Sequence, residues 1–384
     1  MPVFLHIAPR TQWLRAIPAG EYRHESLASE GFIHCSMPEQ LAWVAETFFA
    51  GVSDLVVLRI NSERLRSPLR WETPPGMSEA FPHIYGPLNP SAVLDVIPLE
   101  QALGPPGSNA GPDLRGQVAV VTGGSRGIGR AIAFALARAG ASVAVVARTE
   151  GPLVETVEML RGAGGRALLG VSADVSEPGA FDRVLREVES QLGPVQLLVN
   201  CVGVVGPIGP LWECDPNAWW RSVEINLRGP MNCCAAALPG MLTRGKGRIV
   251  NVASGAGTQA FAYLSAYVVA KTALIRYTEN LAAEAGPGGV TAFAIEPGTV
   301  RTAMAEEALE SEAGKKWVPW FRSIFDEGRD VSAEHAAQLV IALASGQADL
   351  LSGRFLTIAD DLVRLTELAR QGNLSDLQLL RLRT

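Results

Sequence analysis

The chain has 384 residues, of which 48% are hydrophobic and 19% are charged, and its formal net charge is −6. This composition is typical of a globular chain of two domains and excludes disordered and fibrous proteins. The net negative charge argues against binding to nucleic acid, which is itself negatively charged. No apolar run approaches the ~18 residues of a membrane span. The five cysteines form no C-x-x-C pair, so we expect reduced thiols in the cytoplasm and no metal site.

Residues 1–100 predict a small α+β domain, because short apolar runs alternate with turn residues and one helical stretch. Four of the five histidines lie here, together with seven Arg, no Lys and eleven acidic residues, a net charge of −4 that disfavours an RNA substrate. One histidine at a strand end is usually a core residue, whereas four near Arg23 indicate a candidate site. The histidines are His6, His24, His34 and His83; strands are expected at Val3–Ile7, Phe32–His34, Asp54–Ile60 and Ala92–Ile97, and a helix at Pro38–Phe49.

Residues 101–116 read QALGPPGSNAGPDLRG and predict a flexible linker, because they are rich in Gly and Pro and poor in apolar side chains. Residues 117–384 then alternate apolar strands with helices. Strands that are apolar on both faces predict a parallel sheet covered by helices on both sides, a doubly wound α/β fold of Rossmann type. Strands are expected at Gln117–Thr122, Ser142–Ala147, Ala167–Ser172, Val195–Asn200, Arg248–Ala253, Val290–Ile295 and Arg354–Ile358, with helices that include Glu177–Leu192, Pro216–Leu242 and Leu264–Ala285.

A glycine-rich turn, TGGSRGIG at Thr122–Gly129, follows the first of these strands and opens an expected helix that runs to Ala139. Gly123, Gly127 and Gly129 permit a tight turn and a close approach of the backbone to a diphosphate. The helix N-terminus adds unpaired N–H groups and the positive end of its dipole. The strand, turn and helix together predict a dinucleotide site.

The end of the next strand bears on the choice of cofactor. A site specific for NAD would place an acidic residue near Ala147 to bind the ribose 2′-OH. Ala147 cannot do this, whereas Arg148, with Arg126 of the glycine-rich turn, can pair with a 2′-phosphate. We therefore expect NADP(H) rather than NAD(H); the alternative is that Arg148 is merely a solvated residue.

A candidate catalytic set lies further along the chain. Tyr267 and Lys271 are four residues apart on an expected helix, so both side chains lie on one face. A lysine ammonium near a phenol favours the phenolate and lowers the pKa of the tyrosine, which can then act as a general acid or base. Ser254 follows the end of a strand, where ligands bind in open α/β sheets. Asn226 lies in an expected helix and could hold a water behind Lys271.

With these motifs, residues 117–360 resemble a short-chain dehydrogenase/reductase. The resemblance implies reversible hydride transfer between a nicotinamide cofactor and a small carbonyl or alcohol substrate. Ser254 would then orient the oxygen, Tyr267 would exchange its proton, and Lys271 would bind the nicotinamide ribose. The implied catalytic residues are Asn226, Ser254, Tyr267 and Lys271, and the implied cofactor-binding residues are Gly123, Ser125, Arg126, Gly127, Ile128, Gly129, Arg148, Asp174, Val175, Asn200, Gly203, Tyr267, Lys271, Pro297, Gly298, Thr299, Val300 and Thr302.

Two features of this region are particular to the chain. The family's Asn-Asn-Ala-Gly stretch reads Asn200-Cys201-Val202-Gly203, so we expect altered packing of the cofactor wall without loss of activity. Residues 304–328, where the family places a lid, are rich in apolar and aromatic residues. Such a lid suits an apolar or aromatic substrate, although the same residues could simply pack on the domain or on a neighbouring subunit. The resemblance also implies a homodimer or homotetramer built on the long helices.

The first hundred residues resemble a small bacterial domain of unknown function that is grouped with ADP-ribosyltransferase-like folds. The stretches FLHIAPR and GFIHCS are similar to the two histidine-bearing strands of RNA 2′-phosphotransferases, which use NAD. The resemblance implies that His6 and His34 line an NAD-like pocket, with Ser36 beside it and Arg23 at a phosphate.

The leading hypothesis is therefore an NADP(H)-dependent oxidoreductase fused to a small accessory domain. One alternative is a transferase-like N-terminal module that uses NAD or ADP-ribose, with the reductase domain as its helper. The other is a module that senses NADP(H) without turnover, which the complete Ser-Tyr-Lys set argues against.

Overall fold

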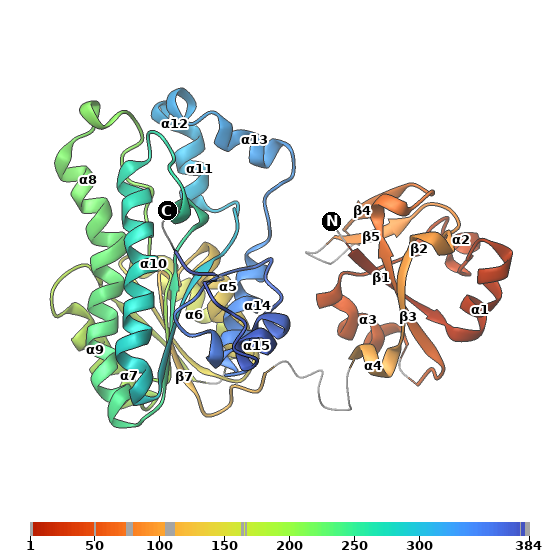
Figure 1. Ribbon diagram of the computed structural model, residues 1–384, viewed down its shortest axis with the longest axis horizontal. Helices are drawn as coiled ribbons and strands as arrows, with labels where there is room; N and C mark the ends of the chain where they lie inside the picture. The colour runs from red at the N-terminus through yellow and green to blue at the C-terminus, as the bar shows by residue number, and fades with distance from the viewer. Residues whose placement is uncertain are drawn as a thin grey trace. The chain divides into compact units, whose positions relative to one another are not determined.

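The computed structural model describes residues 3–49, 51–73, 80–103, 112–162, 165, 167–376 and 378–380. It divides into two compact units, 1–111 and 112–384, each with its own core (Figure 1). The boundary falls within the predicted linker, whose residues 104–111 lie outside the described part. On its N-terminal side, helix α4 (Leu99–Leu103) takes up the first three residues of that linker. On its C-terminal side, Leu114 is buried in the core of the second unit.

The first unit contains two antiparallel three-stranded sheets, with strand orders β1-β3-β6 and β2-β5-β4. The four strands expected from the sequence are present, and Pro38–Phe49 forms a 3₁₀ turn followed by helix α3. Sequence analysis missed β4 and β5, in which charged residues or Pro82 interrupt the apolar pattern, and α1, which contains Pro18. The elements are β1 (Val3–Pro9), α1 (Arg10–Ala19), α2 (Ser26–Ser29), β2 (Ile33–His34), α3 (Leu41–Phe48), β3 (Leu55–Asn61), β4 (Leu69–Glu72), β5 (Phe81–Ile84) and β6 (Val93–Pro98).

The second unit is a doubly wound α/β domain, which confirms the predicted fold class. Its described residues form a parallel seven-stranded sheet of order β13-β12-β11-β10-β7-β8-β9. The order reverses between β7 and β10, the point at which such sheets open a crevice for ligands. The strands are β7 (Val118–Thr122), β8 (Ser142–Ala147), β9 (Leu168–Ser172), β10 (Leu197–Asn200), β11 (Gly247–Val252), β12 (Val290–Glu296) and β13 (Phe355–Thr357).

Helices cover both faces of this sheet (Figure 1). Helices α5, α6 and α14 form one apolar core with the strands, and α7, α9 and α10 form another on the opposite face. No helix within the described ranges is both long and apolar enough to cross a membrane. The helices of this unit are α5 (Gly127–Arg138), α6 (Glu150–Gly162), α7 (Ala180–Gln191), α8 (Pro216–Val223), α9 (Gly229–Thr243), α10 (Ser265–Ala285), α11 (Ala303–Glu310), α12 (Glu312–Trp317), α13 (Trp320–Asp326), α14 (Ala333–Ala344) and α15 (Leu362–Arg370).

The stretch 216–242, expected as one helix, is interrupted by a π-helical turn at Glu224–Arg228 between α8 and α9. Pro230 follows this turn and has no N–H to donate to the carbonyl of Asn226, so a regular α-helical bond cannot form there. Such π turns are frequent at functional sites, and this one contains Asn226.

Candidate active site

The glycine-rich turn after β7 is shaped by close backbone contacts. Gly123 has φ 68°, and a Cβ on it would lie 2.8 Å from the backbone nitrogen of Val202. A Cβ on Gly129 would lie 2.4 Å from the carbonyl oxygen of Gly123, so α5 packs directly on the turn. A side chain at either position would collide with backbone, so the two glycines keep the turn tight beside the helix N-terminus, where unpaired N–H groups bind anions. This cradle fits the diphosphate of a dinucleotide.

One carbonyl group anchors the turn. The carbonyl oxygen of Ser125 accepts hydrogen bonds from Arg130 Nη2 at 2.6 Å, Arg130 Nε at 3.0 Å and Thr156 Oγ1 at 3.0 Å. Arg126, the next residue, is exposed, and Ile128 packs against the core of the domain. Sequence analysis missed Arg130 and Thr156, which support the turn from α5 and α6.

The end of β8 presents a cationic group beside a carboxylate. Arg148 is about half exposed, and its Nη1 lies 3.9 Å from Asp174 Oδ2. Arg221 of α8 donates to the same oxygen at 2.8 Å, a contact that the sequence did not predict. Although burial opposes it, hydrogen bonds from Ser176 and the charges of Arg221 and Arg148 lower the pKa of Asp174. Val175 beside it is buried.

The side chains at the end of β10 and in the loop that follows it point in different directions. The Asn200 side chain is fully buried, and its Nδ2 donates to Asn251 Oδ1 of β11 at 2.8 Å. It therefore connects two strands of the sheet. Cys201 follows, and burial raises the pKa of its thiol to about 12, which leaves the thiol protonated. A Cβ on Gly203 would lie 3.0 Å from Asn226 Oδ1 and 3.7 Å from Lys271 Nζ, so a side chain here would crowd Asn226.

Ser254, Tyr267 and Lys271 meet at the end of β11. Lys271 Nζ lies 5.7 Å from the centroid of the Tyr267 ring and donates to the carbonyl oxygen of Val252 at 2.8 Å. Ser254 begins the turn after the strand, and its Oγ accepts from the Ala256 N–H at 3.1 Å. Lys271 is 4% exposed. The strand end therefore holds the ammonium group on one side of the tyrosine ring.

Burial dominates the protonation of this group of residues. It lowers the pKa of Lys271 to about 8. Burial also raises the pKa of Tyr267, and a hydrogen bond with Ser254 opposes this rise. The expected lowering of the tyrosine pKa by Lys271 is thus not found, because the loss of solvation on burial outweighs the hydrogen bond with Ser254.

Asn226 joins the π-helical turn to the loop after β10. Its Nδ2 donates to the carbonyl oxygens of Val204 at 2.8 Å and Ser222 at 2.9 Å, and its Oδ1 accepts from the Val204 N–H at 3.3 Å. The carbonyl oxygen of an asparagine amide accepts two hydrogen bonds, so one acceptor position of Oδ1 is left beside Gly203. Asn226 therefore positions the wall of the site.

A carboxyl group that sequence analysis missed lies at the end of β12. A Cβ on Gly255 would lie 2.5 Å from Glu296 Oε1, so the carboxylate contacts the turn that begins at Ser254. Burial and the neighbouring charge of Asp360 raise the pKa of Glu296, and a hydrogen bond from the Gly255 N–H opposes the rise. The charge of Glu296 also contributes to raising the pKa of Tyr267.

The segment after β12 returns to the glycine-rich turn. Gly298 has φ 75°, and the carbonyl of Thr299 accepts from the Val331 N–H at 2.8 Å. Thr302 caps α11, and its Cγ2 would lie 3.1 Å from a Cβ on Gly127. The structure thus brings Thr302 to the turn, while Pro297 is buried and Val300 is half-buried.

The histidine rings of the first unit lie in two contacting pairs, His6 with His24 at 5.2 Å and His34 with His83 at 5.1 Å. His6 is 3% exposed, and its ring nitrogens bond to the His34 carbonyl at 2.7 Å and to Tyr22 Oη at 3.1 Å. Burial lowers its pKa to about 3, so His6 is a neutral core histidine. Arg23 pairs with Glu21 at 2.8 Å on the surface, and Ser36 is buried. The rings of His34, His83 and Phe32 form a cluster in which Phe32 stacks on His83 at 4.2 Å and His34 contacts both edge-on.

A parallel doubly wound sheet, a glycine-rich turn at its switch point, and Ser, Tyr and Lys at the next strand end are typical of dinucleotide-dependent oxidoreductases. The comparison with known proteins agrees with this class. The chain belongs to the short chain dehydrogenase family, whose model matches residues 117–313. Residues 7–96 match a protein family of unknown function, DUF952.

Three similar proteins match about two thirds of this chain and most of their own length. A short chain dehydrogenase of Pseudocercospora fijiensis is 35% identical over 67% of this chain and 85% of its own sequence. The 2-(S)-hydroxypropyl-CoM dehydrogenase 3 of Xanthobacter autotrophicus is 35% identical over 62% of this chain and 94% of its own. A crystal structure of a variant actinorhodin polyketide ketoreductase with NADPH superimposes with a TM-score of 0.58 and 31% identity, covering 64% of this chain and 97% of that one. The chain is therefore an oxidoreductase that uses NAD(P) and acts on a small molecule.

Proposed function

We propose that this enzyme is an NADP(H)-dependent reductase of small carbonyl compounds that acts through Ser254, Tyr267 and Lys271. The observation that carries the proposal is the meeting of these three side chains at the end of β11, two strands away from the glycine cradle. When bound, the nicotinamide supplies the hydride.

Residues of the chain would orient the substrate, transfer the proton and bind the cofactor. Ser254 donates a hydrogen bond that orients the carbonyl oxygen of the substrate. Tyr267, whose raised pKa keeps it protonated, delivers a proton to that oxygen. Lys271 binds the ribose hydroxyls, and its ammonium stabilises the phenolate that forms. Asn226 keeps the wall at Gly203 in place and offers its free acceptor position to a water beside Lys271.

The cofactor-binding residues would be those of the cradle, with Arg148 and Arg126 as ligands of a 2′-phosphate. Both guanidinium groups are exposed, Arg148 just after β8 and Arg126 at the start of α5, and Ala147 is followed directly by Arg148 and not by a carboxylate. Arg148 already neighbours Asp174, so its charge is oriented toward this end of the sheet. These observations favour NADP(H). The free thiols of the five cysteines support a cytoplasmic location.

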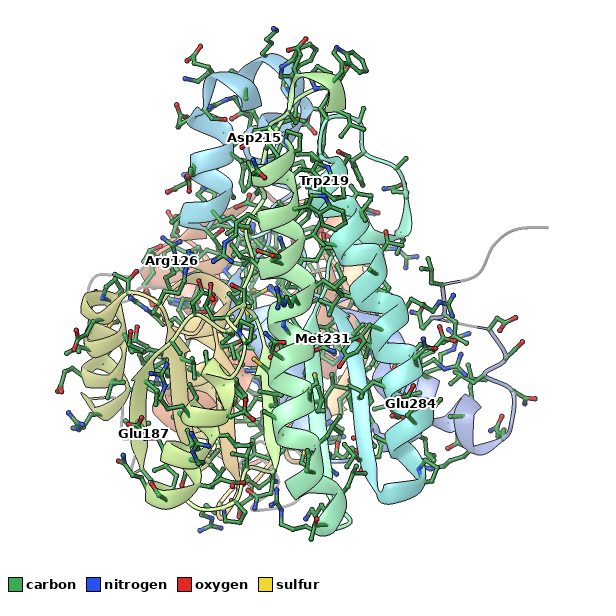
Figure 2. The ribbon with its side chains drawn as sticks, turned by 90° about the vertical axis from the view of Figure 1, so that its left-hand side faces the viewer. Arg126, Glu187, Asp215, Trp219, Met231 and Glu284 are labelled. Atoms are coloured by element: carbon green, nitrogen blue, oxygen red, sulfur yellow. The ribbon has the colours of Figure 1, made fainter. Side chains whose placement is uncertain are left out.

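The proposal extends to a homodimer or homotetramer formed through the surface of α8, α9 and α10. Figure 2 shows this surface, with Met231 near its centre. Trp220, Met231, Leu242 and Val269 are 42–62% exposed on these helices. Exposed apolar side chains that lie on one surface are typical of an interface.

Substitution of Tyr267 tests the proposed function. We expect Tyr267→Phe to lower kcat for the NADPH-dependent reduction of ketones and aldehydes by about 10²–10⁴-fold, because the proton donor is lost while the ring is kept. NADPH affinity should change little in the same protein. Reduction at the wild-type rate by this variant would contradict the proposal.

A further inference from the structure

The entrance to the site is bordered by loops that follow three neighbouring strands. The loop after β10 contains Gly209, the loop after β11 contains Phe261 and Tyr263, and the segment after β12 contains α12 and α13. Because the strands are parallel and adjacent, these loops rise from one edge of the sheet, above Ser254 and Tyr267. These loops therefore lie at the end of the sheet that holds Ser254.

Two pairs of aromatic rings join these loops. The ring of Tyr263 lies 4.8 Å from that of Trp317 of α12, with an interplanar angle of 39°. The ring of Phe261 lies 5.3 Å from that of Trp320 of α13, with an angle of 31°. Tyr263 and Trp320 are still 37% and 41% exposed, so part of each ring is free to contact a further molecule.

The backbone of Tyr263 is held in a conformation that side chains rarely adopt. Its φ is 70°, a strained value for a tyrosine and one found mostly where function demands it. Its carbonyl oxygen accepts from the Gly209 N–H at 2.9 Å, and a Cβ on Gly209 would lie 3.6 Å from Trp317 Nε1. The strain thus places the Tyr263 ring where three loops meet.

The same segment leads directly into the catalytic helix. Tyr263 precedes Tyr267 by four residues and lies just before α10, and Trp219 Nε1 of α8 donates to Ser265 Oγ at 2.9 Å at the start of that helix. Figure 2 labels Trp219 between these two helices. This hydrogen bond connects the C-terminal end of the segment to α8.

Two cationic side chains lie over aromatic rings of the lid. Lys316 Nζ lies 4.4 Å from the centroid of the Trp317 ring, and the Arg301 guanidinium lies 4.6 Å from that of Phe325. Both cations are thus bound to rings of the lid. The ring contacts between the lid and the loop after β11 are tilted, with interplanar angles of 31° and 39°.

We infer that Tyr263 and Trp317, with Phe261 and Trp320 beside them, form an aromatic gate that selects planar aryl ketones or aldehydes over aliphatic ones. Tyr263 is then a residue that determines specificity. The inference rests on the proposed function. An aryl substrate that separates the rings of the gate would stack on them and so replace the contacts that the rings made with each other. An aliphatic substrate of the same size would separate the rings without forming such stacking contacts.

The test compares an aryl ketone with its cyclohexyl counterpart, for example acetophenone and cyclohexyl methyl ketone, in NADPH-dependent steady-state assays of the full chain. Tyr263→Gly removes the ring and also relieves the strained φ, so this variant is expected to fold. We expect it to lower kcat/KM for the aryl ketone about five- to tenfold relative to the cyclohexyl ketone. Tyr263→Phe keeps the ring and should keep the wild-type ratio.

Further variants separate the gate from general effects. Trp317→Ala should lower the ratio by a similar factor, and adding Tyr263→Gly to it should lower the ratio no further, because both changes remove one contact. Trp212→Ala removes a ring that is 85% exposed in the loop after β10 and should leave the ratio unchanged. Equal losses for both ketones, or an unchanged ratio in Tyr263→Gly, would overturn the gate. If the wild-type chain reduces neither of these ketones nor any other in a broad panel, the proposed function fails, and the gate fails with it.

Discussion

Lys271 is the residue in which stability and chemistry oppose each other most clearly. Its ammonium is 4% exposed, and burial lowers its pKa from 10.5 to about 8. Where the group is charged, this shift of its pKa destabilises the folded protein by roughly 3 kcal/mol, because each pKa unit corresponds to about 1.36 kcal/mol. The hydrogen bond to Val252 offsets a part of that cost.

We therefore expect Lys271→Met to lose reductase activity and yet to be about 1–2 kcal/mol more stable than the wild type at pH 7. Below pH 8 the folded and unfolded wild-type chains both carry the proton, so the cost is fully present. Between pH 8 and 10.5 only the unfolded chain holds the proton, so the cost disappears and the difference between the two proteins shrinks. Urea unfolding of both proteins at pH 7 and pH 10 measures this difference. A constant difference across the range would contradict the argument.

Arg148 gives a second prediction at the scale of a residue. If it binds the 2′-phosphate, Arg148→Ala should lower the ratio of kcat/KM with NADPH to that with NADH by about ten- to a hundredfold, the worth of a charge-assisted hydrogen bond. Arg161→Ala is the matched control, because Arg161 is also exposed and lies on the next helix in a pair with Glu158. A ratio that stays unchanged in Arg148→Ala would show that this arginine is merely solvated.

At the scale of elements, the junction of β7 and α5 depends on glycines that fit against backbone. A methyl group on Gly129 would meet the carbonyl oxygen of Gly123 at 2.4 Å, and backbone cannot move aside as a flexible side chain can. We expect Gly129→Ala to weaken NADPH binding in calorimetry at least about tenfold and to lower the melting temperature. Gly151→Ala in α6 has open space around the new methyl group and should leave binding unchanged and stability equal or higher. Normal NADPH affinity in Gly129→Ala would contradict the proposed cradle.

The strands of the second unit could be predicted within a residue or two, because runs such as Ser142–Ala147 are apolar on both faces. The glycine-rich turn could be predicted equally well, because a turn of this composition between a strand and a helix is typical of a dinucleotide site. The π-helical turn could not be predicted, although Pro230 marks it, because the helical pattern continues on both sides. The first unit was predicted less completely, since β4 and β5 are short and interrupted by polar residues and proline.

For the candidate site, sequence order and spacing predicted that Ser254, Tyr267 and Lys271 act together. They could not predict the direction in which the pKa values of these residues shift. The protonation of these groups depends on burial, which spacing does not encode. The supporting contacts of Arg130 with Ser125, and of Glu296 with Gly255, depend on tertiary structure and had no separate signal in the sequence.

At the scale of the whole molecule, the proposed interface gives a further prediction. We expect the wild-type chain to run as a dimer or tetramer in light scattering at micromolar concentration. Met231→Glu should shift it to the monomer, because it places a charge within the apolar surface of α9, where Met231 is 42% exposed. Val363→Glu on α15, at a position that is 82% exposed, should leave the mass unchanged. A monomeric wild-type chain would contradict the proposal.

The scarcity of lysine has a practical consequence for the lid. The chain has four lysines, and Lys271 is buried, so amine-directed reagents will find Lys246, Lys315 and Lys316 among the side chains. Two of these three lie in α12, next to Trp317 of the gate. Coupling the enzyme to a sensor surface or a resin through its amines would therefore tether a large share of the molecules by the lid. Attachment through an engineered tag would leave the same helix free, and the activities of the two preparations should differ.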